Sequence, residues 1–171
     1  KATGPERKIV PNEVRPILEP LLSIRDLTIS IQEESYKRIL LEGFNLTVMP
    51  LQIMALVGVS GSGKTTVALS VMRLLSEAFC VGKGKILFKN ENLLEWEPER
   101  IRQWRGKEIG IVFQEPLNAF NPVFSIGFQI GEVLKAHTSL PARARENRIH
   151  QLLEMVGVKD PQRIARSYPH Q

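Results

Sequence analysis

A glycine- and serine-rich octapeptide directly follows a short apolar run, and this combination restricts the fold more than any other feature of the chain. The octapeptide, residues 58–65, reads GVSGSGKT, and the run before it is residues 53–57. A continuous apolar run of this length suits a strand buried on both faces, as in a parallel sheet. Apolar residues then recur nearly all round a helical projection as far as Leu75, so we expect a buried helix that begins at Gly63–Lys64. The order strand, loop, helix predicts an α/β fold.

The octapeptide matches the pattern G-x-x-x-x-G-K-[ST] of a phosphate-binding loop. Glycines let the backbone turn several N–H groups inward, and the following helix points its first amides and its positive dipole end at the same anion. A lysine at position 64 can reach the β and γ phosphates of a nucleotide, and a threonine hydroxyl at position 65 can ligate Mg²⁺. The alternative is a glycine-rich turn with a chance lysine. We predict nucleotide binding by Gly58, Ser60, Gly61, Ser62, Gly63, Lys64, Thr65 and Thr66.

The remaining sequence divides the chain into three parts. Residues 1–20 hold four of the eleven prolines and little apolar periodicity, which is typical of an extended arm or linker. Residues 21–115 form the expected phosphate-binding core, with strand patterns at 22–31, 39–49, 85–88 and 109–113 and a short helix at 98–106. Residues 116–171 form an expected helical subdomain, with amphipathic patterns at 126–134 and 149–156 and a third helix that starts at Asp160-Pro161.

Composition argues against several classes of function. The net charge of +5 arises largely in residues 116–171, where seven basic residues face four acidic ones, but the charges alternate in sign and only 6% of residues are aromatic. We therefore expect no nucleic-acid partner. A single cysteine, Cys80, excludes an internal disulfide and a multi-cysteine metal site. The longest apolar or glycine run, residues 53–59, is far shorter than the ~20 residues of a membrane span.

Four segments of the sequence, in this order, resemble the ATP-binding subunit of an ABC transporter. The SGSG centre of the octapeptide is the first, and residues 111–116, IVFQEP, resemble the Q-loop of that family. Residues 118–123, NAFNPV, and residues 167–171, SYPHQ, resemble its oligopeptide, dipeptide and nickel importer branch. The resemblance covers residues 21–171. It implies a P-loop ATPase core that drives uptake of peptides or nickel with ATP and Mg²⁺.

The resemblance also implies roles for residues outside the octapeptide. Tyr36, 28 residues before Lys64, lies near the position of an aromatic residue that stacks on adenine, although a packed or surface tyrosine is the alternative. Gln114 would lie near Mg²⁺ and the attacking water, which makes Lys64 and Gln114 the catalytic candidates and Thr65 and Gln114 the metal candidates; an ordinary polar residue at a strand end is the alternative. The implied partners are transmembrane permease subunits and a second ATP-binding subunit. The implied location is peripheral, at the cytoplasmic face of the membrane.

A carboxylate for Mg²⁺ is missing from the positions where hydrolysis needs one. The only aspartates are Asp26 and Asp160, and neither ends an apolar strand after the loop. In the resembled family this strand follows a signature motif, and the chain stops at Gln171, just before the signature position. We therefore expect an N-terminal part of such an ATPase that binds MgATP without hydrolysing it. The alternative is a non-catalytic nucleotide-binding or interaction protein that ends naturally at residue 171. No Asn-Lys-x-Asp guanine motif follows the loop, which disfavours a GTPase.

Overall fold

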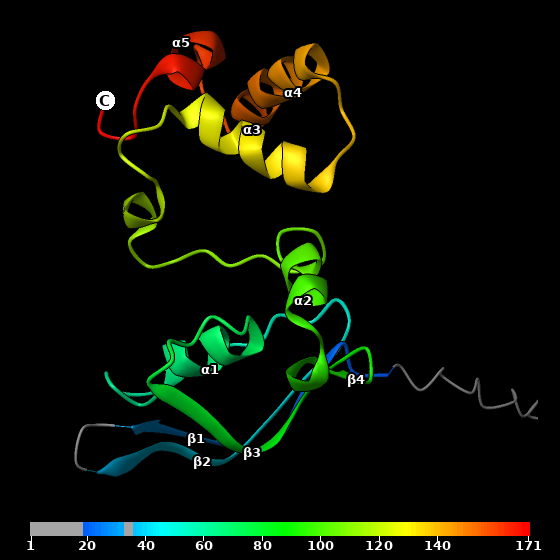
Figure 1. The fold of residues 1–171 in the computed structure, drawn as a ribbon, viewed down its shortest axis with the longest axis vertical. Helices are drawn as coiled ribbons and strands as arrows, with labels where there is room; N and C mark the ends of the chain where they lie inside the picture. The colour runs from blue at the N-terminus through cyan, green and yellow to red at the C-terminus, as the bar shows by residue number, and fades with distance from the viewer. Residues whose placement is uncertain (1–18, 33–35) are drawn as a thin grey trace, which may run out of the picture. The chain divides into compact units, whose positions relative to one another are not determined.

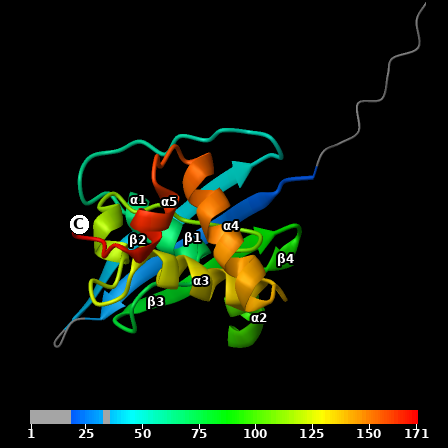
Figure 2. The same ribbon diagram turned by 90° about the horizontal axis from the view of Figure 1, so that it is seen from above.

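The computed structural model describes residues 19–32 and 36–171, and its contacts divide the chain into two compact units (Figures 1 and 2). Unit 1 is Lys1–Glu95 and unit 2 is Trp96–Gln171. Most of the expected N-terminal arm, residues 1–18, lies outside the described residues. The boundary expected between residues 115 and 116 stays a prediction.

Unit 1 is built on an antiparallel sheet whose strands are ordered β2-β1-β3-β4. The strands are β1 (Leu22–Gln32), β2 (Lys37–Val48), β3 (Phe79–Phe88) and β4 (Glu91–Asn92). The centre of the sheet is buried: Ile24 of β1 pairs with Ile86 of β3, and the exposed fraction of each side chain is 1% or less. The structure confirms the strands expected at 22–31 and 39–49. It extends the strand expected at 85–88 back to Phe79, through a stretch with two glycines that breaks the apolar alternation.

The pairing between β1 and β3 is irregular at one place. The pairing register shifts between Arg25 and Thr28, and Asp26 there has a positive φ of 50°. Opposite it, Gly84 has φ 99°, and a Cβ on Gly84 would lie 2.5 Å from the carbonyl oxygen of Asp26. Only glycine fits such a close approach of two backbones in this conformation. The Lys83 ammonium lies 2.6 Å from the Asp26 carboxylate beside it.

Two strands predicted from short apolar runs are not formed. Residues 53–57 and 109–113 lie outside every strand of the described chain, with only an isolated bridge from Arg105 to Ile109. The side chains of Ile53, Val57 and Val112 are 98%, 86% and 88% exposed. A strand needs a neighbour that is hydrogen-bonded along its length, and apart from this bridge neither run has one among the described residues. The prediction of two buried parallel strands is therefore wrong for this structure.

Helix α1 (Lys64–Val71) begins where the sequence predicted, directly after the octapeptide. In unit 1 it lies on one side of the sheet (Figure 1). Its buried residues are Val67, Ser70 and Val71, whereas Leu74 just beyond it is 40% exposed. The segment is thus buried along one face rather than all round. The short 3-10 helix η1 (Leu93–Glu95) closes unit 1, and its Leu93 carbonyl accepts a hydrogen bond from the Arg73 guanidinium at 3.3 Å.

Unit 2 is helical, as expected. It contains α2 (Pro98–Trp104), the 3-10 helix η2 (Pro116–Ala119), α3 (Ile126–His137), α4 (Ala142–Met155) and α5 (Pro161–Arg166). The last three pack on one another, as Figure 2 shows. Gly127 permits a close approach of α3 to α5, since a Cβ there would lie 2.7 Å from the Ala165 carbonyl oxygen. Ser125 caps α3, and Asp160 caps α5 as the sequence predicted.

The sheet of unit 1 and the helices of unit 2 confirm the α/β class with a β-rich N-terminal part and a helical subdomain. Within the described ranges, no helix combines the length and the apolar character that crossing a bilayer requires.

Candidate functional site: the loop before α1

The candidate site is the exposed loop of residues 58–63 together with the first turn of α1. Three glycines shape this loop, two through their backbone conformation and one through a close approach. Gly61 and Gly63 have φ of 78° and 87°, in the left-handed region that costs other residues energy. A Cβ on Gly58 would lie 2.7 Å from the Ser62 hydroxyl oxygen. The loop therefore curls tightly, with Ser62 folded back over its start.

The first amides of α1 are available to an anion. Helix geometry leaves the first four N–H groups without an intrahelical acceptor. No side chain caps this end of α1, and its first turn contains no acidic residue. Because the helix dipole is positive here, and no carboxylate of the first turn competes, the end of α1 favours a negative ligand.

Lys64 turns its ammonium back into the loop. Its Nζ donates to the carbonyl oxygens of Gly58 at 2.8 Å and Val59 at 2.6 Å, and lies 3.3 Å from the Ser62 hydroxyl oxygen. These contacts hold a cation over the curled backbone, beside the exposed end of α1. The sequence pattern predicted the lysine, but it gave no sign that two loop carbonyls would hold its ammonium.

The loop end rests on the neighbouring sheet. A Cβ added to Gly63 would lie 3.8 Å from the Leu40 carbonyl oxygen and 3.8 Å from the Leu41 side chain, and both residues belong to β2. Tyr36 directly precedes β2 and is 55% exposed. Strand geometry places it about 14 Å from Leu40 along the chain direction. An exposed aromatic ring at one end of the strand that supports the loop is compatible with stacking on a base, and this role stays a prediction.

Gln114 lies in unit 2, at a bend directly before η2, and it is exposed. The hydroxyl-bearing residues Ser60, Thr65 and Thr66 lie in unit 1 with the loop. The roles of all these residues in binding or catalysis stay predictions. Among the described residues, no group of three or more histidine, cysteine, aspartate or glutamate side chains could hold a metal ion.

Both aspartates have structural contacts. Asp26 pairs with Lys83 in the sheet, and its backbone N–H donates to the Asn45 side-chain oxygen at 3.0 Å. Asp160 accepts a hydrogen bond from the Arg163 backbone N–H at 3.0 Å at the start of α5. Asp26 belongs to a strand irregularity and Asp160 to a helix cap in the other unit, so neither occupies the end of an apolar strand after the loop.

Sequence comparison identifies the family. The family model described as "ABC transporter" matches residues 41–171, which include the loop, α1 and all of unit 2. The chain belongs to the ABC transporter family. The resemblance that the motifs of the sequence carry is therefore confirmed.

Individual relatives in this family are similar over most of the chain. "Peptidoglycan transport ATP-binding protein YejF" of Agrobacterium fabrum is 36% identical over 154 residues, which are 90% of this chain and 28% of that protein. "Putative peptide import ATP-binding protein BOV_A0348" of Brucella ovis is 36% identical over 159 residues, which are 90% of this chain and 47% of that protein. The chain thus spans less than half of the length of these relatives.

A solved ABC cassette has a similar fold. The structure titled "Dimeric structure of a post-hydrolysis state of the ATP-binding cassette MJ0796 bound to ADP and Pi" matches with a TM-score of 0.71 and 19% identity. The match covers 88% of this chain and 62% of that one. It confirms the ABC cassette fold of the described units.

Proposed function

We propose that the chain is the nucleotide-binding portion of an ATP-binding subunit that powers peptide import. The observation that carries this proposal is the loop before α1, where a lysine ammonium, curled backbone and uncapped helix amides converge without a competing carboxylate in the first turn. Membership of the ABC transporter family supports ATP as the nucleotide, and the names of the relatives support peptides as the solute. Nickel, the other solute of the resembled branch, has no support from these names.

The donor set fits a nucleoside triphosphate. The backbone amides of residues 61–66 would hold the phosphate oxygens, and Lys64 would exchange its loop carbonyls for the β and γ phosphates. The Thr65 hydroxyl would contribute one ligand to Mg²⁺, which in such sites is otherwise held by phosphates and water. Bound Mg²⁺ supplies charge neutralisation at the phosphates. Tyr36 would stack on the base, and Gln114 would be a further ligand of Mg²⁺.

Hydrolysis by this chain alone is not part of the proposal. Phosphoryl transfer to water needs a carboxylate behind the metal and a group that orients the water. Asp26 and Asp160 are engaged in the sheet and at a helix cap, which supports binding without turnover. The same observation favours the second candidate function, a non-catalytic nucleotide-binding or interaction protein.

The proposed assembly follows the family. Transmembrane permease subunits and a second ATP-binding subunit would be the partners, and the chain would be peripheral at the cytoplasmic face of the membrane. The dimeric cassette MJ0796 supports the pairing. Exposed apolar side chains of unit 2, such as Phe124 at 42% and Phe128 at 49%, whose rings stack with centroids 4.7 Å apart, would contribute to the contact with the permease.

Calorimetric titration of the purified chain with MgATP tests this function. The expected result is saturable binding that prefers ATP over GTP, together with no phosphate release above that of the Lys64→Ala variant. Absence of ATP binding by a folded chain would overturn the proposal. Phosphate release that requires Lys64 would contradict the non-hydrolytic part and exclude the second candidate function.

A further inference from the structure

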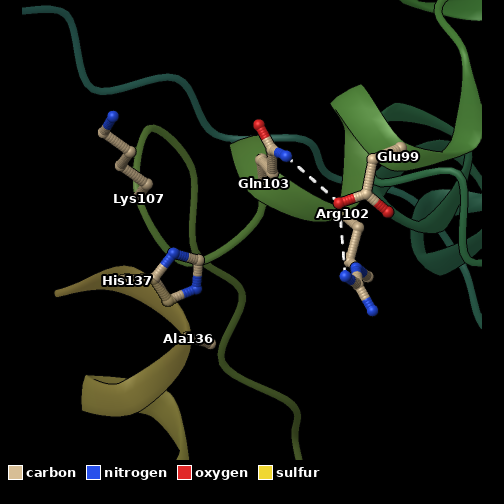
Figure 3. Close-up of a pocket in the computed structure, with 6 residues that line it drawn as sticks. All are labelled: Glu99, Arg102, Gln103, Lys107, Ala136 and His137. Carbon is tan, nitrogen blue, oxygen red and sulfur yellow. Dashed lines mark hydrogen bonds and ion pairs between the residues drawn. The ribbon is translucent and has the colours of Figure 1, made fainter. Parts of the chain in front are cut away.

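A polar cavity in unit 2 is lined by none of the residues of the candidate nucleotide loop and has no role in the proposed function. Its volume is about 510 Å³, and it lies between α2, the turn that follows α2, and the C-terminal end of α3 (Figure 3). The residues that line it are Glu99, Arg102, Gln103, Lys107, Ala136 and His137. Five of these six side chains can form hydrogen bonds, and two are permanent cations at neutral pH.

The single carboxylate of the cavity is already satisfied. Glu99 Oε1 lies 3.2 Å from the Arg102 guanidinium and 3.1 Å from the Gln103 amide nitrogen, as the dashed lines of Figure 3 show. Glu99 therefore balances Arg102. The charge of Lys107 is not balanced in this way, because its side chain makes no hydrogen bond or ion pair within the described ranges. With His137 neutral, two cations and one carboxylate give the lining a net charge of +1.

Lys107 is part of a hydrogen-bonded turn that follows α2. The Gly106 N–H donates to the Ile109 carbonyl at 2.8 Å, and the N–H groups of Lys107 and Glu108 both donate to the Trp104 carbonyl, at 3.3 and 2.9 Å. These bonds fix the backbone that carries the flexible lysine side chain at the edge of the cavity. The ammonium can therefore approach a ligand without a change in the backbone.

His137 is fixed against the same turn. Gly106 has φ 76°, and a Cβ added to it would lie 2.9 Å from His137 Nε2, so the imidazole rests directly on the glycine backbone. Its ring is half-buried and makes no side-chain hydrogen bond or ion pair to the described residues. An imidazole carries at least one N–H donor in either protonation state. A rigidly placed donor and an unbalanced ammonium thus line one cavity, though their residues are thirty positions apart in the sequence.

We propose that this cavity binds an anionic oxygen group, a phosphate or a carboxylate, through Lys107 and His137. Arg102, held by Glu99, adds to the positive field without needing to leave its partner. The site shares no residue with the nucleotide loop, and the inference does not depend on the proposed function. Two oxygens on one ligand group can accept from the ammonium and the imidazole together, which a monatomic ion cannot do in the same way.

The test follows the three histidine side chains by nuclear magnetic resonance in the full chain with Lys64→Ala, which removes phosphate binding at the loop from the measurement. Inorganic phosphate and acetate are titrated separately at pH 7 and constant ionic strength, with chloride as the reference. We expect the His137 ring signals to move saturably with phosphate, acetate or both, while those of His150 and His170 follow the chloride reference. The anion that saturates the shift identifies which of the two groups the cavity prefers.

Variants of Lys107 decide the assignment. Lys107→Glu should remove the saturable shift, and Lys107→Ala should weaken the apparent affinity by roughly two- to fivefold, the range for an exposed charge pair. Lys135→Ala, a change at an exposed α3 lysine that pairs with Glu132 instead, is the matched control and should leave the titration unchanged. Circular dichroism checks that each variant is folded. A His137 shift equal to that in chloride, or one that survives in Lys107→Glu, would overturn the proposal.

Discussion

The Lys64 ammonium nitrogen lies 2.6 Å from the carbonyl oxygen of Val59, so the side chain that follows the loop is tied back to its beginning. Together with the bond to the Gly58 carbonyl, this contact keeps the cation over the curled backbone in the absence of a ligand. The charge that would meet a phosphate is therefore already at the loop, and it has to leave these two carbonyls. The loop is organised before binding, which reduces the entropy that binding must overcome.

Lys64→Ala should weaken ATP binding by roughly ten- to hundredfold while leaving the chain folded. A hydrogen bond to a charged group contributes about 1.5–3 kcal/mol, which is roughly a ten- to hundredfold change in affinity. Because the loop is exposed, removal of the side chain should change the unfolding midpoint little. Calorimetry measures the affinity and circular dichroism the fold. Lys135→Ala serves as the control, and ATP affinity in Lys64→Ala equal to that of the control would contradict the assignment.

Gly84→Ala should destabilise unit 1 strongly. The added Cβ would lie 2.5–2.6 Å from backbone atoms of Arg25, Asp26 and Leu27, and φ 99° is unfavourable for alanine. Backbone atoms cannot move aside as a side chain can, so we expect a loss of about 3 kcal/mol or more. Gly82→Ala in the same strand is the matched control, because nothing lies within 4 Å of its Cβ position and its φ is not positive. Its effect should stay within about 1 kcal/mol. Urea unfolding compares the two, and equal stabilities would refute the close approach.

The parts of the fold that sequence predicts correctly are those whose determinants are local. Gly61 and Gly63 adopt left-handed φ values, Lys64 starts the helix, and Asp160 caps α5. Each of these features is determined by residues that are close to it in the sequence. The strand predicted for residues 53–57 fails because a strand depends on a neighbour, and a run of apolar residues cannot say whether one is present. The contact of His137 with Gly106 joins residues 31 positions apart and leaves no periodic signal, so the cavity of unit 2 could not be predicted.

Stability should depend on pH through Lys83 at the alkaline end. The hydrogen bond to Asp26 and then the attraction of its charge raise the pKa of Lys83 above its ordinary value of 10.5. A group whose pKa is higher in the folded state stabilises that state below its unfolded pKa, and this contribution is lost as the pH rises through the folded pKa. The melting temperature of the wild type should therefore be higher than that of Lys83→Gln at pH 8. This difference in melting temperature should shrink above pH 10.5. In an Asp26→Asn background, Lys83→Gln should show no such alkaline loss, because the ion pair is already absent. A difference between wild type and Lys83→Gln that stays constant to pH 11.5 would contradict the role of the pair.

The exposed apolar run before the loop should make this chain associate. Ile53 and Val57 are 98% and 86% exposed, and burial of apolar surface contributes about 25 cal/mol per Å². Unpaired backbone in an extended apolar segment is also a template for another strand. Sedimentation velocity should show a concentration-dependent increase in mass, and the double change Ile53→Lys with Val57→Lys should reduce it. Asn147→Lys, at an exposed polar position of α4, is the control for added charge and should not reduce the association. A monomer at all concentrations with reversible two-state unfolding would show that this run does not drive association.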